Sequence, residues 1–169
     1  DDFDFVNIST SIVNVNSDDD DVTVTGTTND TDIYGGRQRD TILLQGKVTD
    51  SLVRGDANED KITISGDLSG TIVNGNADND QLIISSSTVS KSSVYGGQGA
   101  DNIDISSGAI YIDGGKGADD IDLTSSKKHT IYGGAGDDAI DSDSTKVLFI
   151  DAGADDDTVT LSGVAASSG

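Results

Sequence analysis

Three short stretches of the chain share one pattern and decide its fold: GGQGAD at residues 96–101, GGKGAD at 114–119 and GGAGDD at 133–138. Each is followed by one variable residue and then by isoleucine, at Ile103, Ile121 and Ile140. Glycine adopts a positive φ without strain and Asp is a common turn residue, so each stretch predicts a tight turn that enters a strand. A regular spacing of this kind indicates a structural repeat.

The register of these turns extends over nearly the whole chain. Eight turns of six residues each end in Asp, and we call these eight residues the Asp column: Asp20, Asp40, Asp60, Asp80, Asp101, Asp119, Asp138 and Asp157. Successive members are 20, 20, 20, 21, 18, 19 and 19 residues apart. Turn positions 2 and 4 hold Gly, Asn or Asp, which tolerate a positive φ, with Gln38 as the one departure. The repeats predict a single domain over residues 1–161, and residues 162–169 are expected to form a tail or linker.

Aliphatic residues recur at fixed places around each turn. Two places before the turn stand Val13, Ile33, Val53, Val73, Val94, Ile112, Ile131 and Ile150. Two places after the column Asp stand Val22, Ile42, Ile62, Leu82, Ile103, Ile121, Ile140 and Val159. Most are β-branched, and alternation with period two places them on one face of a strand.

Each repeat therefore predicts two short strands joined by two turns. One repeat cannot bury its few aliphatic side chains alone, but stacked repeats bury them in a continuous thin interior. This favours a parallel β-solenoid over a set of antiparallel hairpins, which would not need the same turn chemistry on one side of every repeat. The second turn varies in length, as in residues 85–93 and 124–130, so we expect one ordered acidic edge and one irregular edge.

The composition excludes several classes of protein. Of the 31 acidic residues only Glu59 is not Asp, and the net charge is −21, which opposes binding to nucleic acid. No apolar run approaches the length of a membrane span, and the absence of Cys excludes disulfides and thiol catalysis. Disorder, a salt-adapted surface and cation binding all fit such a charge. The preference for Asp over Glu favours tight turns and sites for hard cations.

The pattern G-G-x-G-x-D-x-aliphatic resembles the calcium-binding repeat of the RTX (repeats-in-toxin) family. The resemblance implies an all-β fold, a right-handed parallel β-roll or β-solenoid of about eight coils of 18–21 residues. It also implies several Ca²⁺ ions between successive turns as the bound cofactor. The ligands that it implies are the eight residues of the Asp column, together with Asp78, Asp155, Gly97, Gly99, Gly115, Gly117, Gly134 and Gly136.

Electrostatics supports a cation at the Asp column. Stacked carboxylates about 5 Å apart repel by roughly 3 kcal/mol at an effective dielectric constant near 20. Calcium accepts six to eight oxygen ligands, whereas magnesium resists dehydration. Two alternatives stay open at this point. The Asp side chains could instead cap the turns by accepting backbone N–H groups, and Arg37 and Arg39 could neutralise Asp40 in place of an ion.

The repeats fill the chain, so we expect a calcium-binding structural segment and not an enzyme, with no catalytic residues. The expected location is outside a bacterial cell, in a cell-surface protein such as an S-layer protein, an adhesin or a matrix protein. The open ends of the solenoid would meet flanking domains or identical subunits, and a surface polysaccharide is a further possible partner. One alternative is the repeat domain of a secreted toxin or hydrolase. A second is a β-helix that binds or cleaves polysaccharide, such as a phage tailspike.

Three further patterns lie outside the turns. Asp104, Asp122 and Asp141 are expected to stack on an outer face as a solvated acidic strip. The tyrosines at positions 34, 95 and 132 share one outward column, which fits ordinary strand tyrosines or a platform for stacking sugars. His129 is expected to be a surface histidine.

Overall fold

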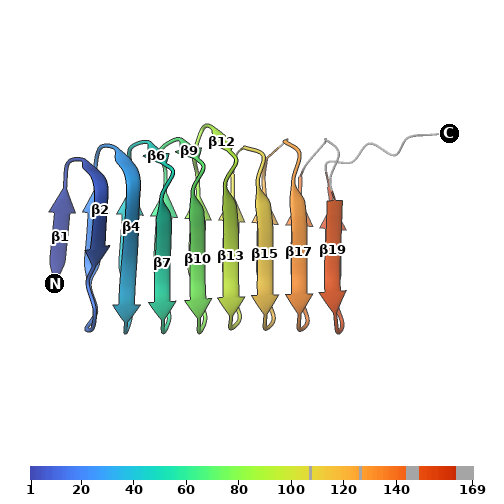
Figure 1. The fold of residues 1–169 in the computed structure, drawn as a ribbon. Helices are drawn as coiled ribbons and strands as arrows, with labels where there is room; N and C mark the ends of the chain where they lie inside the picture. The colour runs from blue at the N-terminus through green and yellow to red at the C-terminus, as the bar shows by residue number, and fades with distance from the viewer. Residues whose placement is uncertain (107, 126, 144–148, 163–169) are drawn as a thin grey trace.

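The computed structural model describes residues 1–106, 108–125, 127–143 and 149–162. Within these ranges the chain forms only strands, turns and bends, wound into successive coils along one axis (Figure 1). All strand pairings in the two sheets are parallel, which confirms the predicted β-solenoid of about eight coils. Of the predicted tail, residues 162–169, only Ser162 falls within the described ranges.

Two sheets form opposite walls of the solenoid, and each takes one strand from every coil. The first sheet has the order β1 (Asp2–Phe5), β3 (Asp21–Val24), β5 (Thr41–Leu44), β8 (Lys61–Ile64), β11 (Gln81–Ile84), β14 (Asn102–Ile105), β16 (Asp120–Leu123), β18 (Ala139–Ser142) and β20 (Thr158–Leu161). The second is built from β2 (Ile8–Asn14), β4 (Thr28–Arg37), β7 (Leu52–Ala57), β10 (Ile72–Ala77), β13 (Ser93–Gln98), β15 (Tyr111–Lys116), β17 (Thr130–Ala135) and β19 (Phe149–Ala154).

The aliphatic columns predicted from the sequence meet between the two sheets. In the first sheet Val22 pairs with Ile42 and Ile42 with Ile62, and the same register continues through the later coils. From the second coil to the seventh, the members of both columns are at most 1% exposed. Because neighbouring coils in parallel sheets lie only about 4.8 Å apart, a ladder of Val, Ile and Leu fills this interior without aromatic bulk.

The edge opposite the acidic turns is more regular than the sequence indicated. Three short strands, β6 (Val48–Thr49), β9 (Leu68–Ser69) and β12 (Val89–Ser90), extend the second sheet beside β4, so several coils have a corner (Figure 1). The backbone turns at a residue with φ between 48° and 64°: Thr10, Asp30, Asp50, Gly70 and Lys91. The expectation of an irregular edge was therefore wrong for the first five coils. The sequence does not reveal this regular turn, because residues of different types occupy its positive-φ position.

A buried hydroxyl follows four of these five corner residues; after Thr10 the hydroxyl of Ser11 is exposed. Ser51 Oγ accepts the backbone N–H of Thr31 at 3.2 Å, and Ser92 Oγ accepts that of Thr71 at 3.1 Å. In the next two coils the corresponding positions hold Ile110 and His129. His129 is only 1% exposed, and burial lowers the pKa of its imidazole. The expectation of a surface histidine was wrong, since the residue occupies an interior column that its local sequence does not reveal.

The two ends of the solenoid expose their interior differently. At the N-terminal end Phe3 and Phe5 occupy the interior columns and pack against the core. At the other end Val159 and Leu161 occupy the same columns and are 42% and 45% exposed. The larger aromatic side chains thus cover the aliphatic ladder at one end, while the last described coil leaves it open.

Candidate metal centre

The acidic turns keep one backbone geometry whether or not they contain glycine. All residues at turn positions 2 and 4 have a positive φ, as the sequence predicted. Even Gln38, the one departure from Gly, Asn and Asp, has φ of 72°. Most side chains strain the backbone at a positive φ, and Gly, Asn and Asp tolerate it best. The backbone conformation of the turn therefore explains which residues occupy positions 2 and 4.

The Asp column lies inside the solenoid and not on its surface. Seven of its eight members are at most 3% exposed, and Asp157 in the last coil is half-buried. Charged carboxylates are rarely buried in this way without a partner, because removing them from water is expensive. Each carboxylate oxygen of the column therefore requires a partner that compensates for its removal from water.

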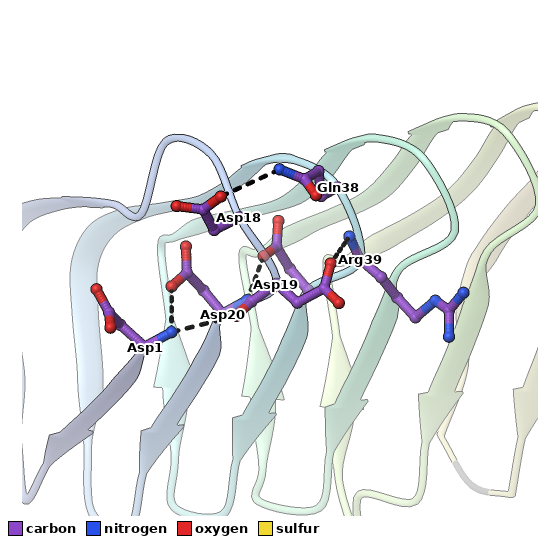
Figure 2. A network of polar contacts seen from close by, with 7 residues as sticks. Asp1, Asp18, Asp19, Asp20, Gln38 and Arg39 are labelled. Atoms are coloured by element: carbon purple, nitrogen blue, oxygen red, sulfur yellow. Dashed lines mark hydrogen bonds and ion pairs between the residues drawn. The ribbon is translucent and has the colours of Figure 1, made fainter.

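One oxygen of each carboxylate caps the preceding turn. The backbone N–H of Asp40 donates to Oδ1 of Asp60 at 2.8 Å, and the N–H of Asp60 donates to Oδ1 of Asp80 at 2.8 Å. The same bond recurs from Asp20 to Asp157 at 2.8–3.0 Å. At the start of the chain the amino group of Asp1 takes this place, donating to Oδ1 of Asp20 at 2.8 Å (Figure 2). The turn-capping role that the sequence left open is thus present in every coil.

The other oxygen has no partner in the structure. Oδ2 is buried and forms no hydrogen bond in six members of the column: Asp40, Asp60, Asp80, Asp101, Asp119 and Asp138. Each of these oxygens lies where the side chain of the first turn residue would otherwise be. That residue is glycine in all six turns, at positions 35, 55, 75, 96, 114 and 133, and a Cβ there would be far inside van der Waals contact of Oδ2.

This space requirement explains the first glycine of the G-G doublet, which sequence reasoning had not assigned to any role. Its φ lies outside the left-handed region, so conformational freedom is not the reason for its presence. The signal was available in the sequence, because a glycine stands five residues before six of the eight column aspartates. The exceptions are Val15 and Ala152 in the first and last turns.

Replacing one of these glycines tests the packing directly. In Gly55→Ala the three atoms nearest to the new methyl group all belong to Asp60, so we expect a loss of roughly 1–3 kcal/mol in the free energy of unfolding. Urea unfolding followed by circular dichroism measures this loss. In the Asp60→Gly background the same substitution should cost much less, because all three obstructing atoms belong to the Asp60 side chain and are gone. Additive costs of the two substitutions would contradict this explanation.

Burial raises the pKa of the six column carboxylates whose Oδ2 has no hydrogen bond. The pKa rises from 3.8 to about 6 for Asp40 and Asp101, about 7 for Asp60 and Asp119, and about 8 for Asp80. Desolvation is the largest cause in every case, and the hydrogen bond from the neighbouring turn opposes it. For most of the column, neighbouring carboxylates raise the pKa further. Near neutral pH these five carboxylates therefore exchange between protonated and charged forms.

The remaining predicted ligands lie at the rim of the turns. Asp78 is exposed, and its Oδ2 accepts the backbone N–H of Asn58 at 3.2 Å; Asp155 is exposed at the same turn position. Within the described ranges no three carboxylate or imidazole groups converge on one point. The side chains of Asp78 and Asp155 are therefore not gathered with the Asp column into a ready-made cage.

The six predicted glycine ligands stack along the column. At turn position 4 the N–H of Gly99 donates to the carbonyl oxygen of Lys116 at 2.7 Å, and that of Gly117 to Ala135 at 2.7 Å. Gly136 makes the corresponding bond to Ala154 at 3.2 Å. Gly97, Gly115 and Gly134 occupy turn position 2, where each carbonyl oxygen lies against the next turn. Backbone oxygens are thus dense along this edge.

The turn that contains two arginines does not neutralise its column residue. Arg39 extends away from the Asp column in Figure 2, and its Nη2 lies 3.9 Å from Oε2 of Glu59, with both side chains exposed. Asp40 keeps a buried Oδ2 without a hydrogen bond, like its neighbours. The possibility that arginine replaces an ion at Asp40 was wrong, because these side chains leave the turn on its solvent side.

The outer acidic strip lies on the first sheet, as predicted. Asp104 pairs with Asp122 and Asp122 with Asp141 on the outward face of β14, β16 and β18. Partial burial and four neighbouring carboxylates raise the pKa of Asp122. The strip is therefore separate from the Asp column, which points inward.

Comparison of the chain with family models, with curated proteins and with solved structures gave no match. No helix that could cross a membrane occurs in the part of the chain that the structure describes. The argument for function therefore depends on the geometry of the acidic turns.

Proposed function

We propose that the chain is a calcium-binding structural segment of a secreted bacterial cell-surface or extracellular protein. Binding of several Ca²⁺ ions along the Asp column would fold the solenoid and make it rigid. The observation that carries this proposal is the set of six buried carboxylates whose Oδ2 atoms have no hydrogen bond.

Charge neutralisation is the first step of the argument. In the described residues the ion pairs join Asp1 to Asp20 and Arg39 to Glu59, so neither reaches the six carboxylates with an unpartnered oxygen. A buried carboxylate that lacks a cationic side chain must take up a proton or an external cation. With pKa values of about 6–8 for Asp40, Asp60, Asp80, Asp101 and Asp119, protons neutralise these carboxylates only in part at neutral pH. A cation completes the neutralisation.

The chemistry of the donors selects the cation. The column offers carboxylate oxygens and the turns offer backbone carbonyl oxygens, without nitrogen or sulfur donors nearby. Calcium prefers such oxygens and tolerates irregular geometry, whereas magnesium demands a strict octahedron. The Oδ2 atoms of the Asp column and the carbonyl oxygens of the turns would hold the ions, and water would complete the shell. Bound calcium would supply the positive charge that the interior of the turns lacks.

Calcium dependence also connects the fold to location. Metal that binds only the folded chain adds its binding free energy to folding. The bacterial cytosol is poor in free calcium and the exterior is not, so the chain would fold only after export. The repeats occupy the described chain almost completely, which suits a spacer or surface layer such as an S-layer, adhesin or matrix protein. Flanking domains or identical subunits would cover the open end at Val159 and Leu161.

A calcium titration tests the proposal. The purified chain, stripped of metal at neutral pH, should show a largely disordered circular dichroism spectrum, and millimolar calcium should restore the β-sheet spectrum. Magnesium at the same concentration serves as the control cation and should restore much less. Metal analysis after dialysis should find several calcium ions per chain. A β-sheet spectrum that is the same in excess EGTA and in calcium would overturn the proposal.

A further inference from the structure

Four aromatic side chains form a continuous row on the outer face of the second sheet. Tyr95, Tyr111, Tyr132 and Phe149 project from β13, β15, β17 and β19. Neighbouring ring centroids are 5.8, 5.6 and 5.5 Å apart, and the rings are tilted against each other by 41–53°. Rings tilted in this way do not cover each other by parallel stacking, and Phe149 remains 49% exposed.

The row is a product of the register between coils. Tyr95 pairs with Asp113, and Asp113 pairs with Tyr132, so aromatic and acidic residues alternate along one outward column. In the adjacent column Tyr111 stands between Ser93 and Thr130. The rings therefore zigzag between two columns and alternate with hydroxyl and carboxylate groups. The sequence showed Tyr95 and Tyr132 in one column but not the ring that joins them.

A shallow groove of about 330 Å³ adjoins the row where it begins at Tyr95. Its polar lining includes Asn74, Gln98, Asp113 and Lys116. The Oδ1 of Asn74 is buried there without a hydrogen bond, while Asp113 accepts the Tyr111 hydroxyl at 3.3 Å. The groove thus combines a ring, amide groups and one side chain of each charge, and its amide oxygen lacks a donor.

We propose that this face binds a linear polysaccharide of uncharged pyranose units, which lies along the solenoid axis across the ring row. The C–H face of a pyranose packs on aromatic rings, and its hydroxyl groups donate to accessible acceptors of the groove such as the Gln98 amide oxygen and the Asp113 carboxylate. Lys116 and Asp113 balance each other within the groove, so it has no excess charge for an ionic ligand. A polyanionic chain would in addition meet the repulsion of a protein with net charge −21.

Stabilisation of the sheet alone does not account for these features. Aromatic pairs contribute about 0.5–1.5 kcal/mol each to a fold, but this requires neither an exposed ring nor an unpaired buried amide oxygen. The fourth tyrosine shows the contrast. Tyr34 lies under the Arg54 guanidinium at 5.8 Å and donates to Asp32 at 3.3 Å, so its ring and its hydroxyl are both engaged.

Tyrosine fluorescence reports on the row, because three of the four tyrosines belong to it and the chain has no Trp. The full chain, kept in calcium and checked by circular dichroism, is titrated with cellohexaose and with N-acetylchitohexaose. We expect saturable quenching by at least one of these oligosaccharides. A mannuronate hexamer and hexalysine serve as the anionic and cationic probes and should bind less tightly. Binding of neither sugar, or binding confined to hexalysine, overturns the proposal.

Matched variants locate the site. Tyr111→Ala and Tyr132→Ala should each weaken oligosaccharide binding about tenfold through loss of one ring contact, while Tyr34→Ala on the same sheet should leave it unchanged. Gln98→Leu should weaken it as well, because an accessible amide acceptor is lost. Isothermal calorimetry provides the readout where a tyrosine is removed. If Tyr34→Ala and Tyr132→Ala weaken binding equally, the row is not the binding site and the proposal fails.

Discussion

Replacing Asp80 by asparagine is expected to have opposite effects with and without calcium. In metal-free buffer at pH 8 the variant should be more stable than the parent chain by roughly 2–4 kcal/mol, because an uncompensated buried carboxylate costs several kcal/mol. The amide oxygen of the variant can still accept the Asp60 N–H that now bonds Oδ1 at 2.8 Å. In calcium the variant should be less stable than the parent, since an amide is a weaker, uncharged ligand.

The measurement compares urea or thermal unfolding of both proteins by circular dichroism in EGTA and in calcium. An osmolyte such as trimethylamine N-oxide brings weakly folded samples into a measurable range. Asp67→Asn is the matched control, because Asp67 is exposed and its bond from Ser87 survives the same change of charge. A stabilisation of equal size in both buffers would show that Asp80 does not bind the ion.

The calcium-free solenoid is expected to gain stability on acidification from pH 8 to pH 5. The pKa of Asp60, Asp80 and Asp119 is about 7, 8 and 7 in the folded chain, against 3.8 for an unperturbed Asp. Between pH 3.8 and these folded pKa values the folded state binds more protons than the unfolded state, so the free energy of unfolding falls as pH rises. The contribution is complete below about pH 3.8, decreases as pH rises, and is fully lost above the folded pKa values of about 7–8. Each such group adds up to about 1.4 kcal/mol per pH unit.

Thermal unfolding of metal-stripped protein across this pH range, in the same osmolyte, checks the sign of the pH dependence. Most proteins instead lose stability on acidification over part of this pH range, because protonation breaks the ion pairs and hydrogen bonds of their carboxylates. With saturating calcium the trend should reverse, since protons then compete with the ions for the same oxygens. A metal-free chain that loses stability steadily from pH 8 to pH 5 would contradict the arrangement of the Asp column.

The two roles considered for the column aspartates prove compatible, because a carboxylate has two oxygens. Oδ1 caps the neighbouring turn in every coil, which ties each coil to the next. Oδ2 is held in the space beneath a glycine, without a protein partner. The cap positions the carboxylate, and the second oxygen is the atom that we propose for the cation. The proposed metal site would be completed by stacking, since its carboxylate and carbonyl oxygens would come from successive coils.

The repeat register, the two strands per coil and the aliphatic interior could all be read from the sequence. Val, Ile and Leu recur with period two beside turns that need Gly, Asn or Asp, and these local preferences agree in every coil. The register of the repeat predicted a positive φ at Gln38, although glutamine is not a residue type that favours this conformation. Local sequence therefore determined the coil, because both the turn and the strand depend on residues close together in the chain.

Only the tertiary structure decided what lies between coils. The inward position of the Asp column is one example, and the bond from each turn to the next carboxylate joins residues about 20 positions apart. The burial of His129 and the contact of Tyr111 with Tyr132 have the same origin. Each depends on which atoms face each other across the spacing of stacked strands. A one-dimensional pattern predicts that coils stack, but the partner of each atom is determined by packing in three dimensions.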